Sequence, residues 1–562
     1  SGEKLVQNAG DKKRTPGWDL TFSAPKTVST VWSQADETTR QKIQQCQEIA
    51  VRKTLDWVEA QTITRRGKGG AIKEPAQLIV ATFEHGTSRT KDPQLHTHCL
   101  VMNAAVRADG TTGAIESRQF YQNKMAAGAL YRAELAKQLT EQLGYRVERT
   151  GQYGNLFEIK GVDPALVEEF SKRRQEIEAA LEAKGYSSAK ASEMAALDTR
   201  HHKGHVARQE LFDEWQKVGQ AFGYRQPSVA HVPSSETAQQ NRRRQMLDQA
   251  LTDLTSREST FTKRDLIRKL AEAAPGTDQG MAQLRQLATE GLSSEAVVSL
   301  GRIKEEPRYT TRELLALEQR MLATVQQAAQ RRTHRVGDRT LSKTLQRHPT
   351  LREEQETALR YLADDHSAIK TVEGWAGTGK TFMLNAAREM WEADGYTVYG
   401  AALAAKAADG LQQGAGIKSQ TLHWLLYRLD KGKVVLNRRS VVVVDEAAMI
   451  GTRQLARLIT ATEAAGAKLV LVGDAQQLQS IETGGGFKKI GEMTGRAELT
   501  HITRQTIEWM RKAVVDMIHG DAASVLRDYA NHSRLTVQET WRDARQALIE
   551  RWQKQALHSP EN

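Results

Sequence analysis

The sequence predicts a multidomain protein of mixed fold class, with an α+β first part and an α/β second part. Three observations predict this class: the length of 562 residues, a pair of alternating strands early in the chain, and a later series of short apolar strands separated by helices. At roughly 100–200 residues per domain, the length corresponds to about three to five domains. Strands that alternate apolar and polar residues form an antiparallel sheet with one buried face, whereas strands that alternate with helices form a parallel sheet.

Composition and charge exclude several classes of protein. Apolar residues make up 39% and charged residues 26% of the chain, which is typical of a globular protein rather than a disordered or fibrous one. The net charge of +12 favours a polyanionic partner, and the alternative is a generally basic protein without one. Two cysteines, Cys46 and Cys99, exclude a disulfide scaffold and fit a reducing cytosol. No apolar run approaches the roughly 18–20 residues of a membrane span, and no signal peptide opens the chain.

The first part begins with an alternating strand that Pro25 ends, with Leu20 and Phe22 on one face and Asp19 and Thr21 on the other. Next we expect a helix with Cys46 in its apolar face, followed by a basic turn at 66–74. Two β-rich stretches at 77–85 and 94–106 lead to a long helix, which runs to about Leu143 and ends at Gly144. A hairpin at 145–160 and a mostly helical segment at 163–225 complete this part.

Two prolines and the run Arg242-Arg243-Arg244 mark the segment 226–245 as a linker, which a small helical region follows to about 305. The arginines of this run, like the basic residues near 66–74, either follow a phosphate backbone or keep the segment soluble. Another helical run starts near 308, and from about Leu351 the strand–helix alternation of a parallel sheet begins.

The most specific motif is the stretch 374–381, Gly-Trp-Ala-Gly-Thr-Gly-Lys-Thr, which matches G-x-x-x-x-G-K-[ST] in full. A strand-like stretch precedes it and a helix is expected to start near Phe382. Its glycines, Gly374, Gly377 and Gly379, let backbone N–H groups close around phosphate oxygens. Lys380 supplies a charge for the β and γ phosphates and Thr381 a hydroxyl for Mg²⁺. The alternative is a glycine-rich turn that arose by chance.

A second element, the β-branched run at 441–444, ends in Asp445 and Glu446. Ligand-binding groups of open α/β sheets lie at the carboxyl ends of strands. Asp445 is therefore placed to hold Mg²⁺ and Glu446 to orient the attacking water. The alternative is that the pair caps the next helix.

Three further residues are candidates for the same nucleotide site. Gln477 follows a third strand at 468–474 and is placed to sense the γ phosphate, or is a polar loop residue. Arg504 is either a γ-phosphate contact or a surface arginine. Gln355 is placed to meet an adenine edge, or is an ordinary glutamine at a helix start.

These motifs together resemble a superfamily 1 helicase of the RecD-like branch over about 345–510. The resemblance implies ATP hydrolysis coupled to movement along single-stranded DNA, with the stretches 401–410 and 419–423 as strand-contacting motifs. The later motifs of that family are not found before Asn562, so we expect the chain to stop inside the second motor domain.

Three histidines form a second constellation, His85, His96 and His98, in the spacing H-x₁₀-H-x-H. His96 and His98 share one face of a strand because side chains alternate, and a hairpin between 77–85 and 94–106 would bring His85 to the same point. Three neutral imidazoles suit Zn²⁺, Mn²⁺, Co²⁺ or Ni²⁺ better than Mg²⁺, and a metal there would act as a Lewis acid on a scissile phosphate. The alternative is a set of core or surface histidines.

Asp19 offers a carboxylate beside this constellation. It would orient a histidine or activate a nucleophile, or else face solvent. A second histidine-rich tract at 201–205 reads as a solvated or DNA-facing segment rather than a metal site.

The stretch 17–26, Gly-Trp-Asp-Leu-Thr-Phe-Ser-Ala-Pro-Lys, and the stretch from His85 to His98 resemble the signatures of MobF conjugative relaxases, which join an HUH relaxase domain to a RecD-like helicase. The resemblance implies that His85, His96 and His98 hold a metal (Mg²⁺, Mn²⁺ or Zn²⁺) and that Asp19 assists a tyrosine nucleophile. The family's tyrosines precede the aspartate strand, and no tyrosine precedes Asp19 here. Because the chain begins with Ser1 rather than Met, we expect an upstream segment to carry the nucleophile.

Together with the boundaries read from the sequence, the resemblance implies an antiparallel-sheet relaxase domain at 1–225, a linker and helical region at 226–345, a phosphate-loop motor domain at 346–497 and the start of a second motor domain at 498–562. The resemblance implies cleavage of one strand at a plasmid origin of transfer, 5′→3′ unwinding with ATP and Mg²⁺, and action in the bacterial cytoplasm followed by passage to a recipient cell. Its implied partners are single-stranded and origin DNA, accessory DNA-binding proteins and a type IV secretion coupling protein. The alternatives are a rolling-circle replication initiator and a DNA- and nucleotide-binding module without complete activity.

Overall fold

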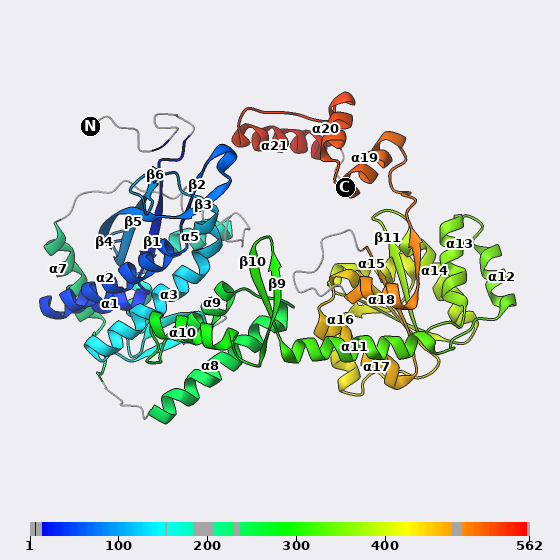
Figure 1. The fold of residues 1–562 in the computed structure, drawn as a ribbon, viewed down its shortest axis with the longest axis horizontal. Helices are drawn as coiled ribbons and strands as arrows, with labels where there is room; N and C mark the ends of the chain where they lie inside the picture. Colours follow the sequence, from blue (N-terminus) through cyan, green and yellow to red (C-terminus); the bar gives the residue numbers. More distant parts are fainter. Residues whose placement is uncertain are drawn as a thin grey trace. The chain divides into compact units, whose positions relative to one another are not determined.

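The computed structural model describes residues 6, 14–151, 154–183, 207–229, 236–474 and 486–558 (Figure 1). The chain divides into two compact units, Ser1–Ser256 with Thr260–Arg312, and Arg257–Ser259 with Glu313–Asn562. The first unit is built on antiparallel sheets and the second on a parallel sheet. The predicted mixed α+β and α/β fold class is therefore confirmed.

The main sheet of the first unit has the strand order β1-β5-β4, with a short β6 paired to β5. Its strands are β1 (Gly17–Ser23), β4 (Gln77–Thr87), β5 (Pro93–Val106) and β6 (Thr112–Gly113). Alternation along β5 buries Leu95, Cys99 and Val101 completely or nearly so, while His96 and His98 point to the opposite face. The two β-rich stretches expected from the sequence are thus β4, at one end of the strand order, and β5, the central strand.

Two long helices, α2 (Glu37–Glu59) and α3 (Arg118–Leu143), are in contact and supply side chains to the cores beneath this sheet. Asp36 begins α2 by accepting a hydrogen bond from the Thr39 backbone N–H at 2.8 Å. Cys46 of α2 lies in the core, as predicted, and burial raises the pKa of its thiol to about 12. Gly144 ends α3 in the left-handed conformation (φ 69°), also as predicted.

The remaining elements of the first unit's N-terminal part are short. They are α1 (Lys26–Gln34), β2 (Ile63–Arg66), β3 (Ile72–Pro75), β7 (Val147–Thr150), β8 (Leu156–Ile159), α4 (Pro164–Glu169), α5 (Lys172–Ala183) and α7 (Arg208–Ala221). The hairpin expected at 145–160 is the β7–β8 pair. The segment 66–74, predicted as a turn, also contributes strand residues to the β2–β3 hairpin, where Arg66 pairs with Asp109 at 2.6 Å. The tract 201–205 lies outside the described residues.

The part of the first unit after residue 235 packs against α3. It comprises α8 (Glu236–Arg257), α9 (Lys263–Ala273), α10 (Met281–Leu292), β9 (Val297–Ile303) and β10 (Glu306–Thr311). Leu251, Leu266 and Leu284 join one core with Leu130 of α3. The buried Glu134 of α3 accepts hydrogen bonds from Lys53 Nζ (2.6 Å) and from the Met281 backbone N–H (2.8 Å), which fixes the start of α10.

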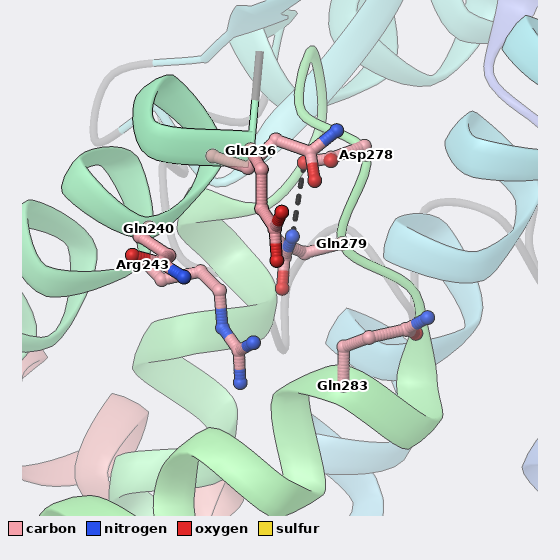
Figure 2. Close-up of a pocket in the computed structure, with 7 residues that line it drawn as sticks. Glu236, Gln240, Arg243, Asp278, Gln279 and Gln283 are labelled. Carbon is pink, nitrogen blue, oxygen red and sulfur yellow. Dashed lines mark hydrogen bonds between the residues drawn. The ribbon is translucent and has the colours of Figure 1, made fainter. Parts of the chain in front are cut away.

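The linker prediction for 226–245 is wrong from residue 236 onward, because α8 begins there. A polar cavity of about 210 Å³ lies between the first turns of α8 and the loop before α10 (Figure 2). Gln279 donates to Asp278 at its rim (2.9 Å), and Arg243 pairs with Glu290 at 3.5 Å. At least Arg243 of the arginine run is therefore partly neutralised within the first unit.

The second unit contains a six-stranded sheet with the order β13-β12-β14-β15-β11-β16, in which every neighbouring pair is parallel. Its strands are β11 (Ile369–Gly374), β12 (Thr397–Ala402), β13 (Ser419–Thr421), β14 (Ser440–Asp445), β15 (Lys468–Gly473) and β16 (Arg496–Leu499). Val441 and Val443 of β14 belong to one core, while Val442 and Val444 belong to another. The β-branched run is therefore buried on both faces of the sheet, as its composition predicts.

Helices on both sides supply these two cores. They are α11 (Arg312–Gln330), α12 (Asp338–Arg347), α13 (Glu353–Ala363), α14 (Lys380–Ala393), α15 (Ala405–Ala415), α16 (Leu422–Asp430), α17 (Thr452–Ala465) and α18 (Gly486–Thr494), and the chain continues through α19 (Glu508–Ile518), α20 (Ala522–Asn531) and α21 (Trp541–His558). Among the described residues, no helix combines the length and apolar character that crossing a membrane requires.

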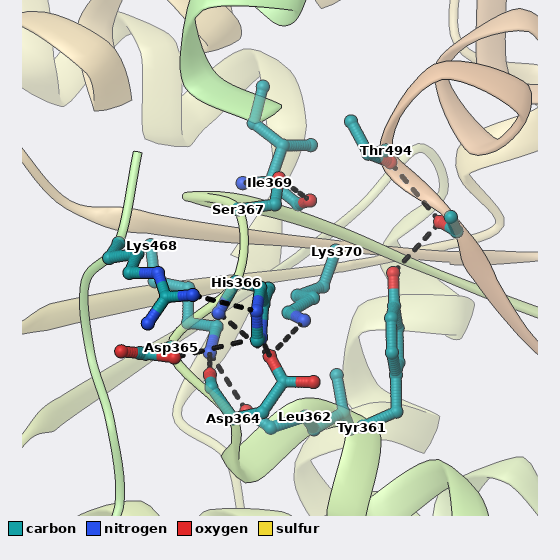
Figure 3. Close-up of polar contacts among 12 residues, drawn as sticks. Tyr361, Leu362, Asp364, Asp365, His366, Ser367, Ile369, Lys370, Lys468 and Thr494 are labelled. Atoms are coloured by element: carbon teal, nitrogen blue, oxygen red, sulfur yellow. Dashed lines mark hydrogen bonds and ion pairs between the residues drawn. The ribbon is translucent and has the colours of Figure 1, made fainter. Parts of the chain in front are cut away.

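Two lysines are buried at the amino ends of adjacent strands, Lys370 in β11 and Lys468 in β15 (Figure 3). Lys468 Nζ donates to the carbonyl oxygens of Leu362 (2.8 Å) and Asp364 (3.2 Å). Lys370 pairs with the Asp364 carboxylate and lies 4.0 Å above the Tyr361 ring. Burial, helped by the charge of Lys370, lowers the pKa of Lys468 to about 7.

This pKa predicts a pH dependence of stability. An unfolded lysine keeps its proton up to about pH 10.4, so between about pH 7 and pH 10 the unfolded chain holds a proton that folded Lys468 has lost. The free energy of unfolding of the second unit should then rise with pH, by at most about 1.4 kcal/mol per pH unit. Lys468→Met should remove this contribution, whereas the same change at the exposed Lys406 should not.

Urea unfolding at pH 7, 8 and 9, followed by pulse proteolysis and detection of peptides from β11 and β15, measures the effect. An equal rise with pH in the wild type and in Lys468→Met would show that Lys468 does not carry it.

Candidate active sites

The three histidines lie together on the face of the first unit's sheet that is turned away from its core. His85 and His96 are direct partners in the β4–β5 register, and His98 lies two residues along β5. Their ring centroids are 5.0–5.4 Å apart, and one ring nitrogen from each lies within 4.8 Å of the others. The structure thus brings together the three imidazoles that the hairpin argument placed at one point.

The Nδ1 atoms of two of these histidines are hydrogen-bonded. His98 Nδ1 lies 2.7 Å from the Asp19 carboxylate, and His96 Nδ1 lies 2.8 Å from the Gln94 carbonyl oxygen. Since both partners are acceptors, each Nδ1 carries the ring proton, and Nε2 is then the nitrogen with the lone pair that a metal would bind. Three half-buried imidazoles this close together are suitable ligands for a divalent transition metal.

Asp19 reaches the cluster from the neighbouring strand β1, where Thr21 is the register partner of His98. Thr21 Oγ1 donates to the other oxygen of Asp19 at 3.3 Å. The aspartate is therefore fixed on one side by a hydroxyl and on the other by an imidazole. This arrangement matches the histidine-orienting role that the sequence left open for Asp19.

A groove of about 530 Å³ runs between β1 and α3, and Asp19 lines it together with two tyrosines. Tyr131 is buried and donates its hydroxyl to Gln47 Oε1 at 2.6 Å, and burial raises its pKa. Its phenol is thus held in the core. Tyr121 is 69% exposed at the mouth of the groove.

The phosphate-binding motif forms the loop between β11 and α14 in the second unit, with Lys380 as the first residue of the helix. Gly377 and Gly379 have φ angles of 82° and 79°, the left-handed region that favours glycine. A Cβ at Gly379 would lie 2.5 Å from Gln355 Nε2, and one at Gly377 would lie 2.9 Å from Arg504 Cβ. Both glycines are thus required by backbone conformation and by close neighbours.

Lys380 lies across this loop, where its Nζ donates to the carbonyl oxygens of Gly374 (2.6 Å) and Trp375 (3.0 Å). Burial lowers the pKa of Lys380, and the nearby carboxylates of Asp445 and Asp474 oppose that shift. Thr381 follows in the first helical turn. The loop, the lysine and the helix start are arranged as a phosphate site requires.

Asp445 and Glu446 lie at the carboxyl end of β14, as predicted. Burial raises the pKa of both carboxyl groups, and the charge of Asp445 adds to the shift of Glu446. A bound cation would lower both pKa values again, because it stabilises the ionised carboxylates. Asp474, which directly follows β15, is also buried and belongs to the electrostatic surroundings of Lys380. Sequence analysis did not select Asp474, although its place after a buried parallel strand is the same signal that identified Asp445.

Gln355 is buried against the phosphate loop. Its side chain is 4% exposed, and Nε2 donates to the carbonyl oxygens of Thr378 (3.1 Å) and Gly379 (3.4 Å). Its Oε1 accepts from the Arg352 backbone N–H at 3.1 Å. In this structure Gln355 ties α13 to the phosphate loop.

The segment after β16 also contacts the loop. The backbone N–H groups of Thr503 and Arg504 donate to the Gly377 carbonyl oxygen at 2.7 and 3.1 Å. Glu354, which the sequence analysis passed over, accepts from the backbone N–H groups of Thr500 (2.8 Å) and His501 (3.0 Å) and so anchors this segment. Arg504 is therefore placed beside the loop, whereas Gln477 lies outside the described residues.

The two predicted strand-contacting stretches, 401–410 and 419–423, lie side by side. Ala401 and Ala402 of β12 pair in parallel with Gln420 and Thr421 of β13. Both stretches leave the sheet at its carboxyl edge, which is also the edge that carries the phosphate loop.

Two family models match the chain: residues 1–222 match the TrwC relaxase family and residues 350–540 match an AAA domain family. The probable conjugal transfer protein TraA of Sinorhizobium fredii is 39% identical over 328 residues, which are 58% of this chain and 30% of TraA. The multifunctional conjugation protein TraI of Escherichia coli is 33% identical over 319 residues, 52% of this chain and 17% of TraI. The chain thus spans less than a third of the length of these relatives.

A structure of the conjugative relaxase TrwC in complex with OriT DNA covers 40% of this chain and 80% of its own, with 34% identity and a TM-score of 0.37. A segment that matches the TrwC relaxase family and a segment that matches an AAA domain family therefore follow one another in one polypeptide, and its relatives include TraA and TraI. These similarities support the interpretation of the chain as a conjugative relaxase-helicase of the MobF type.

Proposed function

We propose that this protein cleaves one DNA strand at a plasmid origin of transfer and unwinds DNA in the 5′→3′ direction with ATP. One observation carries the proposal: a three-histidine cluster oriented by Asp19 and a phosphate loop with its acidic partners occur in the same chain. The support from relatives is that TraA and TraI are conjugation proteins and that TrwC has been solved with OriT DNA.

The relaxase reaction would proceed at the histidine cluster. His85, His96 and His98 would hold a divalent metal, for which Zn²⁺ or Mn²⁺ fits three imidazoles better than Mg²⁺. When bound, the metal supplies Lewis-acid polarisation of the scissile phosphate. Asp19 accepts the hydrogen bond from His98 Nδ1, which favours the tautomer that presents Nε2, and by the family resemblance it would assist a tyrosine hydroxyl. The tyrosine oxygen bonds to phosphorus and the 3′ oxygen leaves, which gives a 5′ phosphotyrosine and a free 3′ hydroxyl.

The motor reaction would proceed at the phosphate loop. Lys380 would turn from the loop carbonyls to the β and γ phosphates of ATP, while Thr381 and Asp445 hold Mg²⁺. Glu446 would orient the attacking water, and Gln477 and Arg504 would contact the γ phosphate. Single-stranded DNA would pass over the stretches 401–410 and 419–423. A binding role for Gln355 would be indirect, through the loop that it holds.

The proposed division of the chain follows the order of the motifs, with a relaxase domain at 1–225, a connecting region at 226–345, a motor domain at 346–497 and the start of a second at 498–562. Accessory DNA-binding proteins, a type IV secretion coupling protein and passage into a recipient cell belong to the proposal through the family resemblance.

The metal site predicts a graded response to substitution. Titration calorimetry with Mn²⁺ or Zn²⁺ should show one site in the wild type, and His96→Ala or His98→Ala should abolish measurable binding. Asp19→Asn should weaken it about 10–100-fold, because an amide orients His98 less well than a carboxylate. His366→Ala, at an exposed histidine outside the cluster, is the control.

Wild-type metal affinity in the doubly substituted His96→Ala, His98→Ala protein would rule out this site. In a protein that includes the upstream segment, the same pair should also abolish cleavage of origin DNA. Metal binding with no cleavage by that protein would favour a binding module instead.

Substitution of two glycines, both with positive φ angles, should affect nucleotide affinity differently. Gly379→Ala should lower the affinity for a fluorescent ATP analogue at least tenfold, because the new Cβ would displace Gln355 from the loop. Gly520→Ala has the same backbone cost of about 1–2 kcal/mol, but its Cβ would meet no atom within 4 Å, so nucleotide binding should be unchanged.

Lys380→Ala should reduce DNA-stimulated ATP hydrolysis by roughly a hundredfold or more. Unchanged hydrolysis in Lys380→Ala would refute the motor assignment.

A further inference from the structure

Helix α16 carries two large aromatic side chains on its exposed face. Leu422, Leu425 and Leu426 bury the opposite face in the core of the second unit. Trp424 and Tyr427 remain 49% and 38% exposed, and their rings stack on each other with centroids 5.1 Å apart and planes 17° from parallel. Packing within the described residues therefore explains the leucines of this helix but not its aromatic face.

Three lysines lie on this helix end or on the segments next to it in the sequence. Lys431 lies one helical turn beyond Tyr427, and Lys418 and Lys433 lie on the segments that flank the helix. All three are exposed, and within the described part of the chain none of them forms an ion pair. The single carboxylate of the helix, Asp430, is engaged by Arg457 at 2.5 Å. The helix thus exposes two aromatic rings, and three exposed lysines on it or on its flanking segments form no ion pair within the described residues.

The helix is also firmly positioned. Thr421 ends β13 and caps α16 by accepting a hydrogen bond from the Trp424 backbone N–H at 3.3 Å. Arg428 donates to Gln420 Oε1 of β13 at 3.0 Å, which ties the helix back to the strand. Because β13 runs parallel to the rest of the sheet, α16 begins at the carboxyl edge, the edge that also carries the phosphate loop.

We propose that Trp424 and Tyr427 form a stacking platform for the bases of single-stranded DNA, with Lys431 and its neighbours contacting the phosphates. An aromatic pair amid uncompensated cations fits this ligand, since bases stack on the rings and the backbone neutralises the lysines. Stacking of this kind does not select sequence, because every base has a π face. The inference rests on the proposed motor function and names residues beyond the strand-contacting stretches.

The first test locates the contact. A 12-nucleotide oligo(dT) carrying 5-iododeoxyuridine is photocrosslinked to the full chain, and the crosslinked peptides are mapped by mass spectrometry. We expect adducts at Trp424 or Tyr427, and their loss in the double variant Trp424→Ala, Tyr427→Ala. Trp541→Ala is the matched control, since Trp541 is an exposed tryptophan of the same unit that lies beside a cation, Arg545. Both variants change exposed side chains, and circular dichroism should show that they fold.

The second test separates stacking from charge. Trp424→Ala should raise the oligo(dT) concentration that half-saturates ATP hydrolysis by about five- to a hundredfold. Trp424→Phe keeps an aromatic ring, so its half-saturating concentration should stay close to that of the wild type. Trp424→Ala should leave the salt dependence of that concentration unchanged. Lys431→Gln should instead reduce the slope of log affinity against log salt by about 0.7.

The outcomes distinguish the platform from the motor itself. DNA-stimulated hydrolysis that is identical in the wild type and Trp424→Ala, with crosslinks elsewhere, would overturn the platform and leave the motor function standing. Such a result would point to a protein partner for this face. A wild-type chain that neither crosslinks to oligo(dT) nor responds to it would overturn both.

Discussion

Strand register is the constraint on which both sites depend. In the first unit, a slip of one residue between β4 and β5 would turn His96 and His98 toward the core and bring Leu95 and Thr97 to the open face. Burial of Leu95, Cys99 and Val101 opposes that slip, because it would expose all three at once. The apolar face of the strand thus determines where the imidazoles lie.

In the second unit, a parallel sheet determines where the ligand-binding groups lie. Its central strands are buried on both faces, so polar groups that must meet a ligand are confined to the strand ends. Asp445, Asp474 and the phosphate loop all lie at the carboxyl edge. Lys370 and Lys468 lie at the amino ends of their strands, but they are buried there, and burial lowers the pKa of each.

Much of both sites was predictable because it depends on local periodicity. The two-residue period of a strand places His96 with His98, and the phosphate-loop sequence fixes its own strand–loop–helix context. The role of Gln355 was not predictable, because its amide direction depends on loop carbonyls 23 and 24 residues away. The prediction of a linker at 226–245 is wrong beyond residue 235, because the charged run Arg242–Arg244 does not distinguish a loop from a helix, and Leu251 and Leu254 further on hold α8 against the core.

The Gly377 carbonyl oxygen accepts hydrogen bonds from both Thr503 and Arg504, and the Trp375 backbone N–H donates to the Leu499 carbonyl oxygen. Backbone hydrogen bonds thus join the phosphate loop to the segment that follows β16 at two places. A nucleotide that shifts the loop must also shift the segment 499–504, which runs through a short connection into α19. These backbone hydrogen bonds connect the nucleotide site directly to the segment that leads into α19.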